Sequence, residues 1–80
     1  GGKLPKPVYT VQEEGKVIVA ITVDRNGNVT NATVQSKGTT VQNRTLWNVA
    51  VQAAKKAKFN ADPTKPATQS GTITYNFKLQ

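Results

Sequence analysis

Hydrophobic and polar residues alternate strictly near the end of the chain. The apolar positions are Ile73, Tyr75, Phe77 and Leu79, and the polar positions between them are Thr72, Thr74, Asn76 and Lys78. Successive side chains of a β-strand point to opposite faces, so this pattern predicts a strand with one apolar and one polar face. A sheet that covers a core on one side only is built from such strands.

Residues 16–23 predict a strand of a different kind. They read Lys-Val-Ile-Val-Ala-Ile-Thr-Val, which is rich in β-branched residues and apolar on both faces. This composition is typical of a central strand that has a neighbour on each edge.

A hairpin is expected directly after this strand. Asn26-Gly27 lies between two apolar runs and favours a type I′ turn, whose two central residues need positive φ angles. With this pair at the tip, Val23 is expected opposite Thr30, and Ile21 opposite Ala32. A slip of one residue would turn every side chain to the wrong face, so the turn and the pattern support the same register.

Helical periodicity begins after Gly38, which closes the second strand. The apolar residues recur at helical spacing and comprise Leu46, Val49, Ala50, Ala53, Ala54 and Ala57. This predicts an amphipathic helix that starts at a cap provided by Thr40 or Asn43 and ends at Phe59. The alanines indicate a close approach of the helix to the sheet.

Trp47 and a group of lysines flank this stripe. Trp47 either borders the core or belongs to a binding face. The lysines either complement the negative end of the helix dipole or bind an anionic partner, and they are Lys55, Lys56 and Lys58.

The element order predicts the topology. Strand, strand, helix and strand make an α+β fold (ββαβ), with an arm at residues 1–15 and a domain at residues 16–80. We expect the arm to dock through Leu4, Val8 and Tyr9. Placing the terminal strand beside the central one gives a three-stranded antiparallel sheet in the order 2-1-3, with the helix packed on one face. The terminal strand is then an edge strand with unpaired backbone groups.

The composition argues against some classes of function but does not identify one. The 80 residues fit one domain, and 11 basic residues against 4 acidic ones give a net charge of +7. This charge indicates either a solvated basic surface or an anionic partner such as nucleic acid. The chain has no Cys and no His, and no motif gathers its few acids, so we expect neither an enzyme nor a cofactor. The loop at 24–35 lacks the glycine and glutamate that an EF-hand requires.

Three segments resemble the carboxy-terminal domain of TonB, particularly in versions from Bacteroidetes. They are Val17–Val29 with its Asp-x-x-Gly-x-Val element, Ala53–Asn60 with its Lys-x-Phe element, and the alternating end Gly71–Gln80. The TolA carboxy-terminal domain, from another envelope adaptor, has a similar general fold. The chain differs from many TonB domains at residues 9–15, where a Tyr-Pro pair and a short helix commonly stand.

The resemblance implies a function by strand addition. TonB proteins are energy transducers that connect a proton-driven inner-membrane motor complex to outer-membrane transporters for iron chelates, vitamin B12 or similar nutrients. The implied location is the periplasm, with an inner-membrane anchor in the full-length protein. The transporter's amino-terminal box peptide would pair with the terminal strand, at Gly71, Thr72, Ile73, Thr74, Tyr75, Asn76 and Phe77. The same edge would allow a homodimer. On this interpretation no nucleic-acid partner is expected, and a basic nucleic-acid-binding module and a TolA-like adaptor remain as alternatives.

Overall fold

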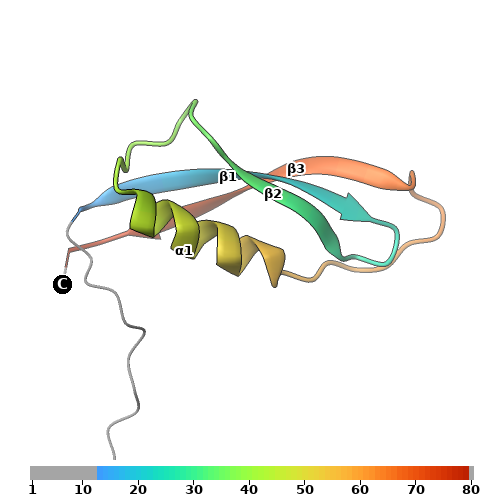
Figure 1. The fold of residues 1–80 in the computed structure, drawn as a ribbon. Coiled ribbons are helices and arrows are strands. Elements are labelled where there is room, and N and C mark those ends of the chain that lie inside the picture. Colours follow the sequence, from blue (N-terminus) through green and yellow to red (C-terminus); the bar gives the residue numbers. More distant parts are fainter. Residues whose placement is uncertain (1–12, 80) are drawn as a thin grey trace, which may run out of the picture.

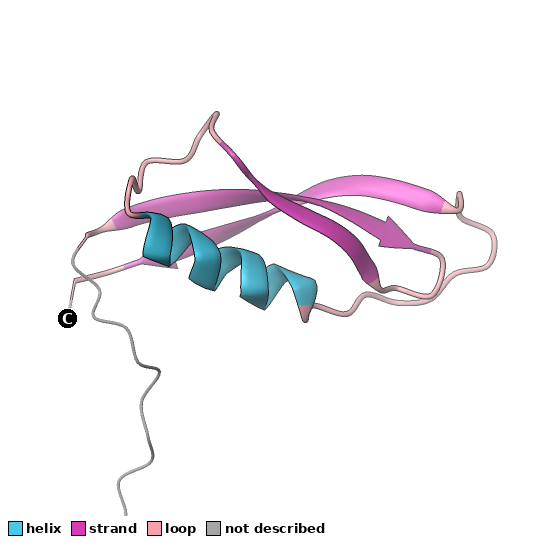
Figure 2. Cartoon of the chain, in the orientation of Figure 1, coloured by secondary structure: helices cyan, strands magenta, loops and turns pink. Residues whose placement is uncertain are grey.

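The computed structural model describes residues 13–79, which form three strands and one helix (Figures 1 and 2). In chain order these are β1 (Gly15–Asp24), β2 (Val29–Gln35), α1 (Arg44–Lys55) and β3 (Thr68–Phe77). The strands make one antiparallel sheet in the order β2-β1-β3. The predicted α+β class, ββαβ order and 2-1-3 sheet are therefore confirmed. The expected docking of Leu4, Val8 and Tyr9 lies outside the described residues.

The central strand β1 contributes buried residues of the sheet to the core. It pairs with β3 over its whole length, from Gly15 opposite Phe77 to Asp24 opposite Thr68. Its residues on the helix side, Val17 and Val19, are completely buried. A strand covered on one face and paired on both edges buries most of its surface, which explains its apolar composition.

The turn between β1 and β2 differs from the expected type I′ turn. The Gly27 N–H donates to the Asp24 carbonyl, and among the turn residues 24–28 only Gly27 has a positive φ, of 83°. This pattern is a type I turn followed by a glycine in the left-handed region. The Asp24 carboxylate explains the difference, because it accepts the backbone N–H groups of Asn26 and Asn28, both at 2.9 Å. This local bonding holds Asn26 at a negative φ.

The hairpin has the predicted register from Ile18 to Thr22 and differs from it next to the turn. Ile21 faces Ala32, as expected, but Val23 faces Val29 instead of Thr30. The longer turn shifts the pairing by one residue, and a bulge next to Thr22 restores it. The extra residue, Thr30, is exposed and directs its hydroxyl to the Thr22 carbonyl at 3.3 Å.

Helix α1 begins at a well-formed cap. The Asn43 side chain accepts hydrogen bonds from the N–H groups of Thr45 at 2.8 Å and Leu46 at 3.3 Å, so Asn43 is the cap and Thr40 is not. The Glu13 carboxylate accepts the N–H groups of Gln42 and Asn43 just before the helix. Glu13, just before β1, is thereby tied to the start of α1.

The far end of α1 corrects two expectations. The helix ends at Lys55, so Phe59 does not close it; Phe59 is 45% exposed. Only Lys55 lies in the last turn, and the Lys58 ammonium donates to the Asn28 side chain at 2.7 Å. The buried stripe is also narrower than the sequence suggests, because Ala53 is exposed.

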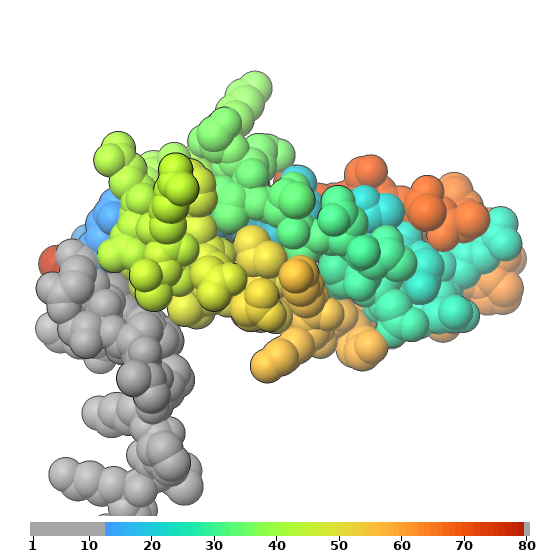
Figure 3. All heavy atoms as spheres, in the orientation of Figure 1, coloured from blue at the N-terminus to red at the C-terminus, as the bar shows by residue number. Residues whose placement is uncertain are grey.

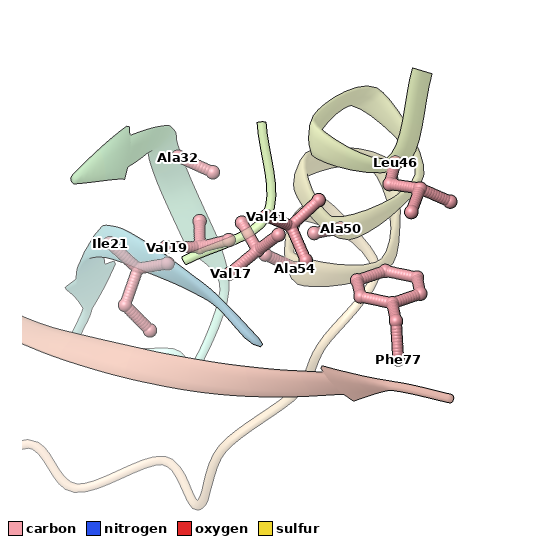
Figure 4. Packing of buried hydrophobic residues seen from close by; sticks show 9 residues of the cluster. All are labelled: Val17, Val19, Ile21, Ala32, Val41, Leu46, Ala50, Ala54 and Phe77. Carbon is pink, nitrogen blue, oxygen red and sulfur yellow. The ribbon is translucent and has the colours of Figure 1, made fainter. Parts of the chain in front are cut away.

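The core lies between α1 and one face of the sheet. The helix packs over β1 and β2, as the ribbon and the space-filling view show (Figures 1 and 3). The ring of Phe77 points from β3 toward the helix (Figure 4). The buried residues of this core are Val17, Val19, Ile21, Ala32, Val41, Leu46, Ala50, Ala54 and Phe77.

Candidate functional site

Strand β3 forms one edge of the sheet. Within residues 13–79 it pairs with β1 on one side and with no strand on the other. Such an edge presents a row of backbone N–H and C=O groups to which another chain can pair. All seven predicted site residues, from Gly71 to Phe77, lie on this strand.

Hydrogen bonds on the other side of the sheet show which backbone groups point outward. The Ile18 N–H donates to the Thr39 hydroxyl at 2.9 Å, and the Asp24 N–H donates to the Asn28 carbonyl at 3.0 Å. Both acceptors lie on the β2 side of β1. Backbone groups alternate in direction along a strand, so even-numbered residues of β1 face β2 and odd-numbered residues face β3.

This parity determines the orientation of each residue in β3. Val17 and Val19 face β3, and their partners Tyr75 and Ile73 are therefore the hydrogen-bonded pairs. The residues between them direct their N–H and C=O groups to the free edge. The outward-facing set comprises Thr68, Ser70, Thr72, Thr74 and Asn76.

The side chains of β3 divide between two environments. Phe77 is buried and Ile73 and Tyr75 are half-buried on the helix side, which confirms the predicted apolar face. Leu79 lies after the end of the strand and is 58% exposed, so it does not continue that face. The threonine side chains of the other face are exposed. The outward backbone groups thus belong to residues with short polar side chains, which leave the edge sterically accessible.

Trp47 borders the core. It is half-buried against the core cluster, and its indole N–H donates to the Val41 carbonyl at 2.6 Å. Of the two interpretations of Trp47, the first is therefore correct.

The acidic side chains of the described residues are dispersed. Residues 13–79 contain no group of three acidic, His or Cys side chains that could hold a metal ion. The pKa of Asp62 is lowered by hydrogen bonds from the Thr64 hydroxyl and the Thr64 N–H. These bonds hold a loop together. Within the same residues, no helix is long and apolar enough to cross a membrane.

The structure has a hollow at the beginning of β3 that the sequence does not predict. It measures about 390 Å³ and lies between β3, the tip of the hairpin and the loop that follows α1. Its lining includes Ile21, Arg25, Phe59 and Gly71. The pairing of Ile21 with a glycine was the available signal, because a glycine opposite a large residue leaves space on that face.

The chain matches a family of known proteins over most of its length. The family model described as "Gram-negative bacterial TonB protein C-terminal" matches residues 4–79. The chain is 37% identical over 79 residues to the protein named "Protein TonB" in Xanthomonas campestris pv. campestris strain B100, and equally to that of a second strain. Each alignment covers 96% of this chain and 34% of the relative, so the chain spans about a third of their length. No solved structure gives a significant match. The chain therefore belongs to the family of carboxy-terminal domains of Gram-negative bacterial TonB proteins.

Proposed function

We propose that this domain is the part of a TonB-like energy transducer that captures outer-membrane transporters. The captured element is an extended segment near the transporter's amino terminus, which adds to the sheet as a fourth strand beside β3. The observation that carries the proposal is the position of β3 at the edge of the sheet, with the backbone groups of Thr72, Thr74 and Asn76 directed outward. Strand addition uses such groups for affinity.

The strength of this contact follows from the number of available groups. Three outward residues in the stretch 71–77 offer three N–H and three C=O groups. Each hydrogen bond contributes roughly 0.5–1.5 kcal/mol net, so six of them provide about 3–9 kcal/mol. Loss of translational and rotational freedom opposes binding by at least about 4 kcal/mol. Backbone pairing alone therefore gives weak, reversible binding, which suits a protein that must release its partner after each cycle.

The remainder of the proposed function concerns the full-length protein. Its other parts would anchor it in the inner membrane, span the periplasm and contact the proton-driven motor complex. Transmission of force to the bound transporter would support uptake of iron chelates, vitamin B12 or similar nutrients. The same free edge can pair with a second copy of the domain, and such a homodimer would compete with the transporter.

The nucleic-acid alternative has less support. Lys58 is bonded to Asn28, and Lys55 lies at the helix end, where a cation suits the dipole. On the sheet face opposite the helix, polar residues of β2 and β3 surround Ile18 and Ala20, and none of the strand residues on this face is an aromatic on which a base could stack. The family match likewise favours TonB over TolA.

A proline substitution tests strand addition. Proline has no N–H, and the Thr74 N–H faces the free edge, so Thr74→Pro is expected to retain the fold and weaken binding at least about tenfold. Binding is measured by NMR titration with a synthetic peptide of a transporter's amino-terminal segment. Thr74→Val keeps the N–H and is the matched control.

The same titration gives the contradicting results. In the unsubstituted domain, peptide binding is expected to shift the amide signals of residues 71–77. Shifts confined to the turn at residues 25–28, or none at millimolar peptide, would exclude this edge as the binding site. Unfolding of Thr74→Pro would show that its N–H pairs with β1 instead.

A further inference from the structure

The hollow beside β3 lies where an added strand would project side chains. Helix α1 ends at Lys55 and does not reach the first half of β3, so this end of the helix-side face is left open. The paired residues Ile21 and Gly71 line it from the sheet, and Phe59 lines it from the loop after α1. Arg25, from the hairpin tip, supplies a polar rim.

Hydrogen bonds fix the shape of the hollow without any ligand. The Asp62 N–H donates to the Arg25 carbonyl at 3.0 Å, and the Arg25 Nε donates to the Lys65 carbonyl at 2.8 Å. The Phe59 N–H donates to the Gly27 carbonyl at 2.9 Å. These three bonds connect the loop to the hairpin, so the cavity is formed before a partner arrives. Its lining combines the apolar side chains of Ile21, Val23 and Phe59 with polar and charged groups from the hairpin tip and the loop. A preformed cavity of this mixed character can hold a ring by its faces and a polar group at its rim.

Gly71 gives the hollow direct access from the free edge. It pairs with Ile21 and points toward the helix side, but it has no side chain. A Cβ at this position would lie 3.9 Å from the Ile21 Cγ1, an ordinary contact distance, so packing does not require a glycine here. Neighbouring strands are about 4.8 Å apart, and an aromatic side chain on the next strand can lie across a glycine.

We propose that this hollow receives one aromatic side chain from the bound segment, at the position opposite Gly71. The inference rests on the proposed function, because the segment is the added strand. The backbone groups of Gly71 face β1. In a segment that runs antiparallel to β3, the residue opposite Gly71 therefore occupies a non-hydrogen-bonded position, where side chains approach most closely. An aromatic ring there covers Ile21, contacts the Phe59 ring and lies near the Arg25 guanidinium.

This assignment gives specificity to an interface that otherwise has little. Backbone pairing accepts almost any extended sequence, whereas a single filled pocket selects one register and one class of residue. A slip of one residue would turn the ring to the opposite face of the sheet. The aromatic residue would therefore set the position of the segment along β3.

A phenylalanine scan of the bound peptide tests the proposal. Each position of a synthetic peptide from a transporter's amino-terminal segment is replaced in turn by Phe and by Ala, and Kd is measured by NMR titration. We expect one position at which Phe binds about tenfold more tightly than Ala. At that position the Phe ring should also shift the methyl signals of Ile21 by its ring current.

Two variants of the domain identify the site. The quantity compared is the Kd of the Ala peptide divided by the Kd of the Phe peptide. Gly71→Val fills the hollow and should reduce this ratio to about one. Phe59→Ala removes one wall of the hollow and should lower the ratio severalfold. Thr74→Val, which adds a valine on the opposite face of the same strand, should leave the ratio unchanged. Each variant is compared through this ratio, so a general loss of affinity does not affect the conclusion.

The outcomes separate the two proposals. Amide shifts in β3 with equal affinities for Phe and Ala at every position would overturn the pocket and leave strand addition intact. A preference that survives Gly71→Val would also overturn the pocket. Absence of any shift in β3 with every peptide would overturn strand addition and the pocket with it.

Discussion

Replacement of Gly27 by alanine is expected to loosen the loop that follows α1. Gly27 has a φ of 83°, a conformation that residues with a Cβ adopt at a penalty. A Cβ at this position would collide with the Phe59 carbonyl oxygen and lie 2.7 Å from its carbonyl carbon. Both colliding atoms belong to the backbone, so the loop itself must move.

The expected loss in the free energy of unfolding has two parts. The left-handed conformation of a non-glycine residue destabilises the fold by about 1–2 kcal/mol. Separation of the loop breaks the hydrogen bonds from the Phe59 N–H to Gly27 and from the Asp62 N–H to Arg25, at about 1 kcal/mol each. The expected total is about 3–4 kcal/mol. For a domain of this size that corresponds to a decrease in Tm of roughly 12–30 °C.

Thermal and urea unfolding monitored by circular dichroism measures this effect. Gly38→Ala is the matched control, because Gly38 has a φ of 88° but a Cβ there meets only the Ile18 side chain, at 3.2 Å. The control should lose only about 1–2 kcal/mol. Equal losses in the two variants would refute the reasoning, because the collision with the loop would then contribute nothing.

Three further predictions concern α1 and the loop. Asn43→Ala removes the helix cap and should lower the free energy of unfolding by about 1 kcal/mol in urea titration, whereas Asn48→Ala, at an exposed helix position, should leave it nearly unchanged. Ala54→Leu inserts a large side chain at a completely buried position and should lower the free energy of unfolding by about 1–3 kcal/mol in the same titration. The pKa of Asp62 is lowered by the Thr64 hydroxyl and N–H, so its stabilising contribution is present above the unfolded-state pKa and is lost as the pH falls through the lower folded-state pKa. NMR titration should place that pKa below the reference value of 3.8, and Asp62→Asn should weaken the dependence of stability on acidic pH.

The order and register of the elements could be predicted because several signals agreed. The alternation at the end of the chain, the apolar run of β1 and the turn position each restrict the same topology. The turn type could not be predicted from the Asn-Gly pair alone. The carboxylate of Asp24 competes for the backbone of the turn, and a bulge at Thr30 then compensates for the extra residue.

The candidate site was only partly predictable. The edge position of β3 followed from the apolar composition of β1. The direction of the Thr74 N–H, however, depends on which residues of β1 face β2, and the hydrogen bonds of Ile18 and Asp24 show this only in the structure. The hollow depends on where the loop after α1 returns. That path is fixed by hydrogen bonds between Asp62, Arg25 and Lys65, which no local pattern in the sequence reveals.

Amide hydrogen exchange along β3 tests most directly whether this strand is a free edge that accepts another. In the isolated domain the amides of Thr72, Thr74 and Asn76 should exchange rapidly, while those of Ile73 and Tyr75 should be protected by β1. Addition of a transporter peptide should protect the first three amides. Uniform protection along β3 before any peptide is added, or unchanged exchange at saturating peptide, would contradict the account.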